Sequence, residues 1–207
     1  MMVTEISKQK RDPNKANVFI DGVFSFALHT QDIAYFKLKE GQEVSEEVVA
    51  FIQDNLVYMK AQDTALHYIG YRMRTEKEVR QKLQDKEYLP ETIERVIEFS
   101  KKYRYINDEE YAKKYVQEKL RLKPEGAFAL KMALLQKGIK EEICERVLTE
   151  AEMNEAEDAL RWLEKKTRGI WPANDKKKKQ LFDFLRRKGY GYEIINEAFR
   201  RMEEGEA

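Results

Sequence analysis

The stretch FLRRKGYGYE, at residues 184–193, repeats a pattern that the chain has already used in ALLQKGIKEE (133–142) and KLQDKEYLPE (82–91). In each copy a leucine lies three residues before a lysine, and successive leucines are 51 residues apart. Apolar residues around each leucine recur at the spacings i, i+3 and i+4, which form one face of a helix. The pattern predicts two helices in each copy, joined by a tight turn at the lysine.

A second series of apolar residues marks another helix in front of each copy. Ala65, Ala112 and Ala159 are 47 residues apart, and apolar or aromatic residues follow each of them three and four positions later. The distance from each of these alanines to the leucine of the same copy grows by four residues from one copy to the next, which is about one helical turn. We therefore expect three tandem three-helix units whose first connection lengthens progressively.

These repeats predict the domain organisation. Residues 1–58 form a separate N-terminal domain, and the three repeats are placed at 59–107, 108–154 and 155–207. A unit of about 45–50 residues buries too little surface to be stable alone, so neighbouring repeats should cover one another and form an elongated body. The predicted fold class is mostly α, with three tandem three-helix repeats preceded by a small β-hairpin and helix domain.

Capping residues support the helix boundaries. Thr75 and Glu78 have the spacing of a capping box. Asn107 is the expected N-cap of a helix with an acidic first turn, and Pro90 suits the first position of a helix.

The turn after the repeated lysine should be closed by a left-handed residue. Gly138 and Gly189 stand where such a residue ends a helix. In the first copy Glu87 replaces the glycine, so that turn must close in another way.

The N-terminal residues follow the two-residue period of strands. VFIDGVFSFAL (18–28) alternates around Asp21 and Gly22, which predicts a hairpin. Val3–Lys8 is the candidate third strand, with residues 11–15 as the loop before the hairpin.

Two helices should follow these strands. Residues 30–36 are expected to form a short helix capped by Thr30. A second helix should start at Ser45 and continue past Tyr58 without a helix breaker before Tyr71, linking the N-terminal domain to the first repeat.

Composition narrows the class of protein. The 207 residues include 39 Lys and Arg against 38 Asp and Glu, so the chain lacks the excess of positive charge that is typical of a DNA-binding domain. No apolar stretch is long enough for a membrane span. A single cysteine cannot form an internal disulfide, which favours a reducing, cytoplasmic location.

Residues suited to catalysis are scarce. His67 belongs to a solvated helix face, and Cys144 occupies the position of Ile93 and Ile195 in the other copies, which predicts a core residue. The acidic cluster at 108–110 is explained by helix capping. No spacing suits zinc or a phosphate-binding loop. We therefore expect no enzyme activity, no cofactor and no metal site.

Basic residues near helix ends are the candidate partner-binding residues. An ordinary solvated, salt-bridged helix surface is the alternative interpretation. Tyr103, Tyr105 and Trp171 lie among these cations and suit either stacking on a partner or packing within the protein. The candidates are Arg72, Arg74, Lys101, Lys102, Arg104, Arg121, Lys123, Lys176, Lys177, Arg186 and Arg187.

Three motifs carry a family resemblance. ALHYIGYRMRTEKEVRQKL (65–83), YINDEEYAKKYV (105–116) and LLQKGI (134–139) resemble signatures of the RecX family of bacterial recombination regulators. The resemblance covers about 61–204, and the hairpin domain is similar to an N-terminal extension in some members. It implies binding to a RecA-type recombinase, in the groove of the recombinase–DNA filament, and restraint of strand exchange.

The resemblance also implies functional positions. Of the residues that match the first motif, Thr75 and Glu78 have capping roles. Arg72 and Arg74 are therefore the pair expected to contact the partner. The residues that match the other two motifs are Asp108, Tyr111 and Ala112, then Lys137, Gly138 and Ile139.

The resulting hypothesis is a non-enzymatic, monomeric modulator that docks along a recombinase filament through several weak contacts and inhibits its ATPase and strand exchange. A direct nucleic-acid binder and a helical scaffold for another protein are the alternatives. Weak direct contact with DNA is compatible with the hypothesis of a filament-binding modulator.

Overall fold

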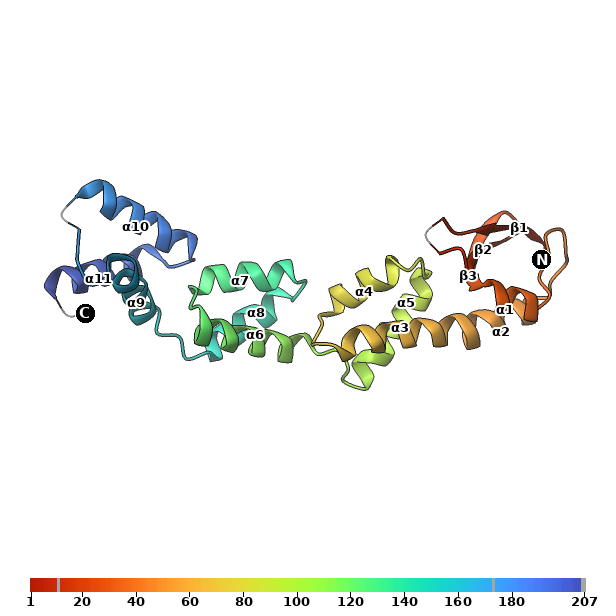
Figure 1. Cartoon of the computed structure of the whole chain (residues 1–207). Coiled ribbons are helices and arrows are strands. Elements are labelled where there is room, and N and C mark those ends of the chain that lie inside the picture. Colours follow the sequence, from red (N-terminus) through yellow and green to blue (C-terminus); the bar gives the residue numbers. More distant parts are fainter. Residues whose placement is uncertain (11, 173, 206–207) are drawn as a thin grey trace. The chain divides into compact units, whose positions relative to one another are not determined.

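The computed structural model describes residues 1–10, 12–172 and 174–205 (Figure 1). The chain divides into two compact units, Met1–Asn107 and Asp108–Ala207. It is mostly helical, with three tandem three-helix repeats preceded by a small three-stranded sheet. This confirms the predicted class and the number of repeats.

The N-terminal sheet is antiparallel, with the strand order β1 (Val3–Lys8), β2 (Lys15–Ile20) and β3 (Val23–His29). The β2–β3 turn has positive φ at both Asp21 (48°) and Gly22 (81°), as a two-residue hairpin requires. The predicted hairpin and third strand are therefore confirmed. In the predicted loop 11–15, Arg11 lies outside the described residues.

The short helix α1 (Thr30–Tyr35) begins differently from the prediction. His29 is its N-cap, and no side chain caps it. Thr30 is already helical, and its backbone N–H donates to the carbonyl oxygen of Asn14 at 2.9 Å. The prediction that Thr30 caps this helix is wrong, because the chain passes directly from β3 into α1.

One continuous helical segment links the sheet to the first repeat, as predicted. It comprises α2 (Glu46–Phe51), the π-helical turn η1 (Ile52–Val57) and α3 (Tyr58–Gly70). Ser45 caps it by accepting a hydrogen bond from Val48 N. Ile52 and Val57 are both buried in the N-terminal core, and their spacing of five residues fits the i→i+5 bonding of a π-helix.

The first repeat consists of α3, α4 (Glu76–Gln84) and α5 (Pro90–Lys102). Thr75 and Glu78 form the complete capping box, and Pro90 occupies the first turn of α5, as predicted. The α4–α5 turn closes because Glu87 itself adopts a left-handed conformation, with φ 61°. The Glu87 carboxylate also accepts a hydrogen bond of 2.6 Å from Gln9, which fixes the turn against the N-terminal domain.

The second unit contains the other two repeats. Repeat 2 consists of α6 (Asp108–Leu122), α7 (Ala127–Gln136) and α8 (Glu141–Glu150), and repeat 3 of α9 (Glu155–Thr167), α10 (Asp175–Arg187) and α11 (Tyr192–Glu204). Gly138 and Gly189 have φ of 84° and 89° after α7 and α10, as predicted.

Both repeating series lie in the cores of the repeats. The members of each series are fully buried at equivalent places: Ala65, Ala112, Ala159, Leu83, Leu134 and Leu185.

The first connection of the repeats does not lengthen progressively, contrary to the prediction. Four residues separate α6 from α7, against five between α3 and α4. In repeat 2 the additional residues extend the helix, because α6 continues for ten residues past Ala112 whereas α3 continues for five past Ala65. The four residues that repeat 2 adds between its alanine and its leucine are therefore part of a longer helix and do not lengthen the connection.

Repeats 2 and 3 meet at a close backbone joint. The N–H of Gly126, the N-cap of α7, donates to the carbonyl oxygen of Lys188 at 2.9 Å. A Cβ atom on Gly126 would lie 2.3 Å from the carbonyl oxygen of Gly189, and one on Gly189 would lie 2.4 Å from Ala129 Cβ. Only glycine allows this approach of the two backbones.

Side chains complete the joint. Trp162 of α9 donates its indole N–H to the Pro124 carbonyl oxygen at 2.9 Å. Glu155 accepts a hydrogen bond of 2.7 Å from Ala127 N, which places a carboxylate at the positive end of α7. These two contacts hold α9 against the α6–α7 connection and the start of α7.

Candidate partner-binding surfaces

The two arginines after α3 differ in their surroundings. Arg72 is exposed. Arg74 is half-buried, its guanidinium carbon lies 3.9 Å from the centroid of the Tyr68 ring, and its Nε donates to the Tyr68 carbonyl oxygen at 3.5 Å. Arg74 therefore has a packing role that sequence reasoning missed, whereas Arg72 is fully available to a partner.

The end of α5 lies beside the start of α4. Lys101 forms an ion pair of 2.6 Å with Glu76, which also binds Arg80 at 2.8 Å. Partial burial of Glu76 acts to raise its pKa, but the hydrogen bonds from Lys101 and Arg80 outweigh it, and the pKa of the carboxyl is lowered. Of the predicted cations, Lys101 is thus engaged in an ion-pair network of repeat 1.

The end of α5 and the residues after it carry an aromatic and basic cluster that is largely exposed. The rings of Phe99, Tyr103 and Tyr105 lie 4.8, 5.9 and 6.4 Å from one another, and both tyrosines are about half exposed. Lys102 lies 5.7 Å from the Tyr103 ring centroid, and Arg104 is exposed in a left-handed conformation. This set, named here the Tyr103 cluster, combines rings and cations on one surface.

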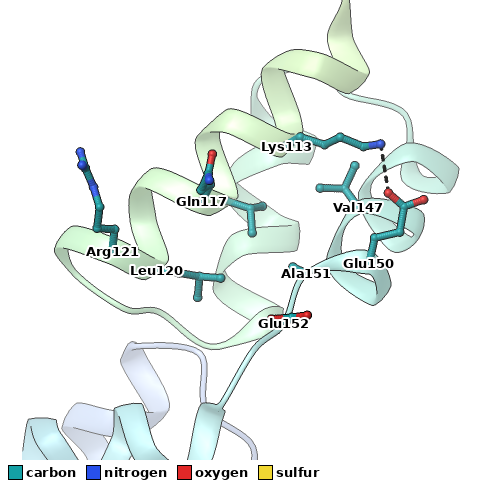
Figure 2. Close-up of a pocket in the computed structure, with 9 residues that line it drawn as sticks. Lys113, Gln117, Leu120, Arg121, Val147, Glu150, Ala151 and Glu152 are labelled. Atoms are coloured by element: carbon teal, nitrogen blue, oxygen red, sulfur yellow. Dashed lines mark ion pairs between the residues drawn. The ribbon is translucent and has the colours of Figure 1, made fainter.

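In repeat 2 the candidates Arg121 and Lys123 are exposed at the end of α6. Arg121 is at the rim of a pocket of about 600 Å³ between α6 and α8 (Figure 2). Leu120 and Val147 supply apolar lining, and Figure 2 shows Arg121 extending away from these apolar side chains.

The rim of this pocket carries both signs of charge. Lys113 and Glu150 form an ion pair of 3.0 Å across it, and Glu152 and Arg121 add one charge of each sign. The pocket therefore offers apolar contact without electrostatic preference.

In repeat 3 the candidates lie at opposite ends of α10. Lys176 and Lys177 are in its first turn and Arg186 and Arg187 in its last, and all four are exposed. Two of these candidates, Lys177 and Arg187, line a second pocket from the two ends of α10, together with Lys166 of α9. Lys166 lies eleven residues before Lys177 in a different helix and is not among the candidate residues predicted from the sequence.

Trp171 has a structural position within repeat 3. Its ring lies 4.9 Å from that of Phe199, and its indole N–H donates to Glu203 at 3.2 Å. Of the two uses that the sequence left open for this residue, the structure favours packing.

The described residues hold few groups suited to chemistry. They contain no set of three or more His, Cys, Asp or Glu that could hold a metal ion. His67 is exposed, as predicted, and its Nε2 forms a hydrogen bond of 3.1 Å with the Tyr71 hydroxyl. Cys144 is buried, as predicted, and this burial raises the pKa of its thiol. No helix in the described part of the chain is long and apolar enough to cross a membrane.

These features define a helical-repeat protein whose candidate sites are exposed cations, rings and shallow pockets. Family models match four consecutive segments: the regulatory protein RecX N-terminal domain at 1–45, and the first, second and third three-helix domains of RecX at 61–99, 107–148 and 154–199. The chain belongs to the RecX family, as the motifs predicted.

Whole-chain relatives agree with these matches. The regulatory protein RecX of Clostridium perfringens (strain 13 / Type A) is 33% identical over 99% of this chain and 97% of its own, and that of Clostridium tetani is 34% identical over 97% and 94%.

Solved structures of the family share the fold. A crystal structure of regulatory protein RecX has a TM-score of 0.63 and 25% identity, covering 94% of this chain and 97% of its own. The structure of RecX from Lactobacillus salivarius has a TM-score of 0.64 and 28% identity, covering 71% and 97%.

Proposed function

We propose that this protein is a non-enzymatic regulator that binds a RecA-type recombinase filament on DNA and inhibits its ATPase and strand exchange. Membership of the RecX family, whose curated relatives are named regulatory proteins, is the observation that carries the proposal. The protein would act in the cytoplasm as a monomer, because a filament already supplies a repeating partner surface.

The distribution of the predicted cations supports this mode of binding. Exposed candidates occur in all three repeats, represented by Arg72, Arg121 and Arg187. Modules linked in one chain gain affinity for successive subunits through effective concentration, so each contact can be weak. A repeating partner is therefore better suited to this surface than a single small ligand.

Arg72 and Arg74 are the residues that we place at the centre of the contact. Arg72 is exposed, whereas stacking on Tyr68 orients Arg74 and reduces the entropy that it would lose on binding. The other proposed contacts are Lys101, Lys102, Arg104, Arg121, Lys123, Lys176, Lys177, Arg186 and Arg187.

The test is the single-strand-DNA-stimulated ATPase of the cognate recombinase, titrated with this protein. Inhibition well below one molecule per recombinase subunit is expected, since a filament-bound regulator affects several subunits. Arg72→Glu should weaken inhibition about tenfold, the effect of losing one charge-assisted contact.

Lys140→Glu is the matched control, because Lys140 is an exposed lysine outside the proposed contacts. Equal inhibition by Arg72→Glu and Lys140→Glu would remove Arg72 from the site. No inhibition by the wild type at excess would refute the proposed function.

Direct contact with single-stranded DNA is a second candidate, favoured by the Tyr103 cluster. Rings beside cations stack on bases and neutralise phosphates. The double variant Tyr103→Ala, Tyr105→Ala should weaken binding of a labelled oligonucleotide about tenfold or more, whereas Tyr35→Ala, at another exposed tyrosine, should not. Binding that is unchanged in the double variant would exclude the cluster from DNA contact.

A further inference from the structure

The second pocket, in repeat 3, lies between the end of α9 with its following connection and the helix α10. Its volume is about 600 Å³, and three cations line it: Lys166 of α9, Lys177 in the first turn of α10 and Arg187 at the end of α10. We call it the Lys166 pocket. Lys177 and Arg187 lie ten residues apart on α10, and the packing of α9 against α10 adds Lys166 to the same pocket.

Acidic side chains do not neutralise this pocket. No Asp or Glu is among its lining residues, and none of its three cations forms an ion pair within the described part of the chain. Other lysines of the protein behave differently: Lys178 pairs with Glu203 at 2.6 Å, and Lys131 lies within 3 Å of two glutamates. The Lys166 pocket therefore has an uncompensated positive charge that favours an acidic ligand.

The floor of the pocket is apolar. Ile170, one of the lining residues, is 77% exposed. Leu181 and Phe184 are half-buried beside it. The Lys166 ammonium lies 4.7 Å from the Phe184 ring centroid, so it covers one face of this ring, and the Trp162 ring makes a T-shaped contact with the same ring at 5.7 Å.

We propose that the Lys166 pocket binds an acidic peptide segment of a partner protein, with an apolar side chain on Ile170 and carboxylates on the surrounding cations. A nucleic-acid backbone would satisfy the cations but would leave Ile170 and Leu181 exposed to water. A neutral apolar segment would cover the floor but would leave three charges without partners. A peptide that carries both features satisfies both parts of the pocket.

The test measures the fluorescence anisotropy of labelled synthetic probes with the full-length protein. The first probe is a ten-residue peptide with two leucines flanked by glutamates, and the second has serines in place of the leucines. The third is a single-stranded oligonucleotide of mixed sequence. No recombinase is present, so the result is independent of the proposed function.

The leucine peptide should bind, and binding should weaken as salt rises because the contacts are partly exposed. Lys177→Glu and Arg187→Glu should each lower its affinity about tenfold, as expected for loss of a charge-assisted contact. Ile170→Ser should lower it while leaving the charges intact. Lys179→Glu is the matched control, because Lys179 is exposed on α10, does not line the pocket and is outside the proposed recombinase contacts. This variant should bind the leucine peptide as the wild type does.

Three results would overturn the proposal. The leucine peptide does not bind at millimolar concentration. The serine peptide binds as well as the leucine peptide, which would make the pocket a general site for anions. The oligonucleotide binds more tightly than both peptides and is equally sensitive to Lys177→Glu, which would assign the pocket to nucleic acid.

Discussion

Replacing Gly126 with alanine should open the joint between repeats 2 and 3. The added Cβ would lie 2.3 Å from the carbonyl oxygen of Gly189 and 2.7 Å from the backbone nitrogen of Tyr190. These are backbone atoms, so they cannot move aside as a flexible side chain would. The two backbones must separate by about 1 Å to restore an ordinary carbon–oxygen contact of about 3.3 Å.

The cost of this separation has two parts. Forcing a methyl group into a packed contact costs about 1–3 kcal/mol. The movement also breaks the hydrogen bond from Gly126 N to the Lys188 carbonyl oxygen, which contributes about 1 kcal/mol. The free energy of unfolding of the second unit should therefore fall by about 2–4 kcal/mol beyond the effect of alanine at an N-cap.

Gly191→Ala isolates the N-cap effect. Gly191 caps α11 with φ −69° and ψ 163°, nearly the same as φ −68° and ψ 158° at Gly126, and neither glycine has a capping side chain. A Cβ on Gly191 would meet nothing within 4 Å. Both variants lose about 1 kcal/mol of capping free energy, and only Gly126→Ala adds the clash.

Urea unfolding followed by tryptophan fluorescence is the assay. Both tryptophans, Trp162 and Trp171, are in repeat 3, so the signal reports the second unit. With a slope of about 2 kcal/mol per M, the midpoint of Gly126→Ala should lie about 1–2 M below that of Gly191→Ala. Equal midpoints would refute the close-packed joint.

Three further predictions concern stability. The Tyr190 hydroxyl is buried without a hydrogen-bond partner among the described residues, so Tyr190→Phe should raise the free energy of unfolding by about 1 kcal/mol. A lower free energy of unfolding for this variant in urea would show that the hydroxyl forms a hydrogen bond in the folded protein. Because the pKa of Glu76 is lowered in the folded state, its contribution is present above its unfolded pKa of about 4.3 and is lost as the pH falls through the folded value. Between pH 7 and pH 3 the free energy of unfolding, measured with urea, should therefore fall by about 1 kcal/mol more for the wild type than for Glu76→Gln. Parallel pH curves for the two proteins would contradict this. The fragment 108–154 should be largely unfolded by circular dichroism, whereas 108–205, which keeps the joint, should melt cooperatively; a cooperative transition in the shorter fragment would show that repeat 2 is autonomous.

The helices and their ends could be predicted because their signals are local. The i, i+3, i+4 spacing around Leu83 and its equivalents reports which face is buried, and in the structure these leucines are fully buried with partly buried apolar residues beside them. Ser45, Thr75 and Pro90 act within one turn of their own helix, so their roles follow from a few neighbouring residues. The family motifs have the same local character.

Errors arose where a local pattern had more than one structural solution. Thr30 resembles an N-cap, but the chain enters α1 directly from a strand. Four added residues resemble a longer loop, but in repeat 2 they extend α6. Arg74 resembles a free surface cation until the Tyr68 ring is found beneath it.

The sequence by itself therefore determined the three-helix repeats, the hairpin domain and the family, because helical and strand periods are properties of short backbone segments. Only the tertiary structure decided that Gly126 and Gly189 must lack a Cβ, and that Lys166, Lys177 and Arg187 share one pocket. Gly126 and Gly189 are far apart in the chain, and Lys166 is in a different helix from Lys177 and Arg187, so these proximities depend on how whole helices pack. Helix periodicity carries no information about that packing.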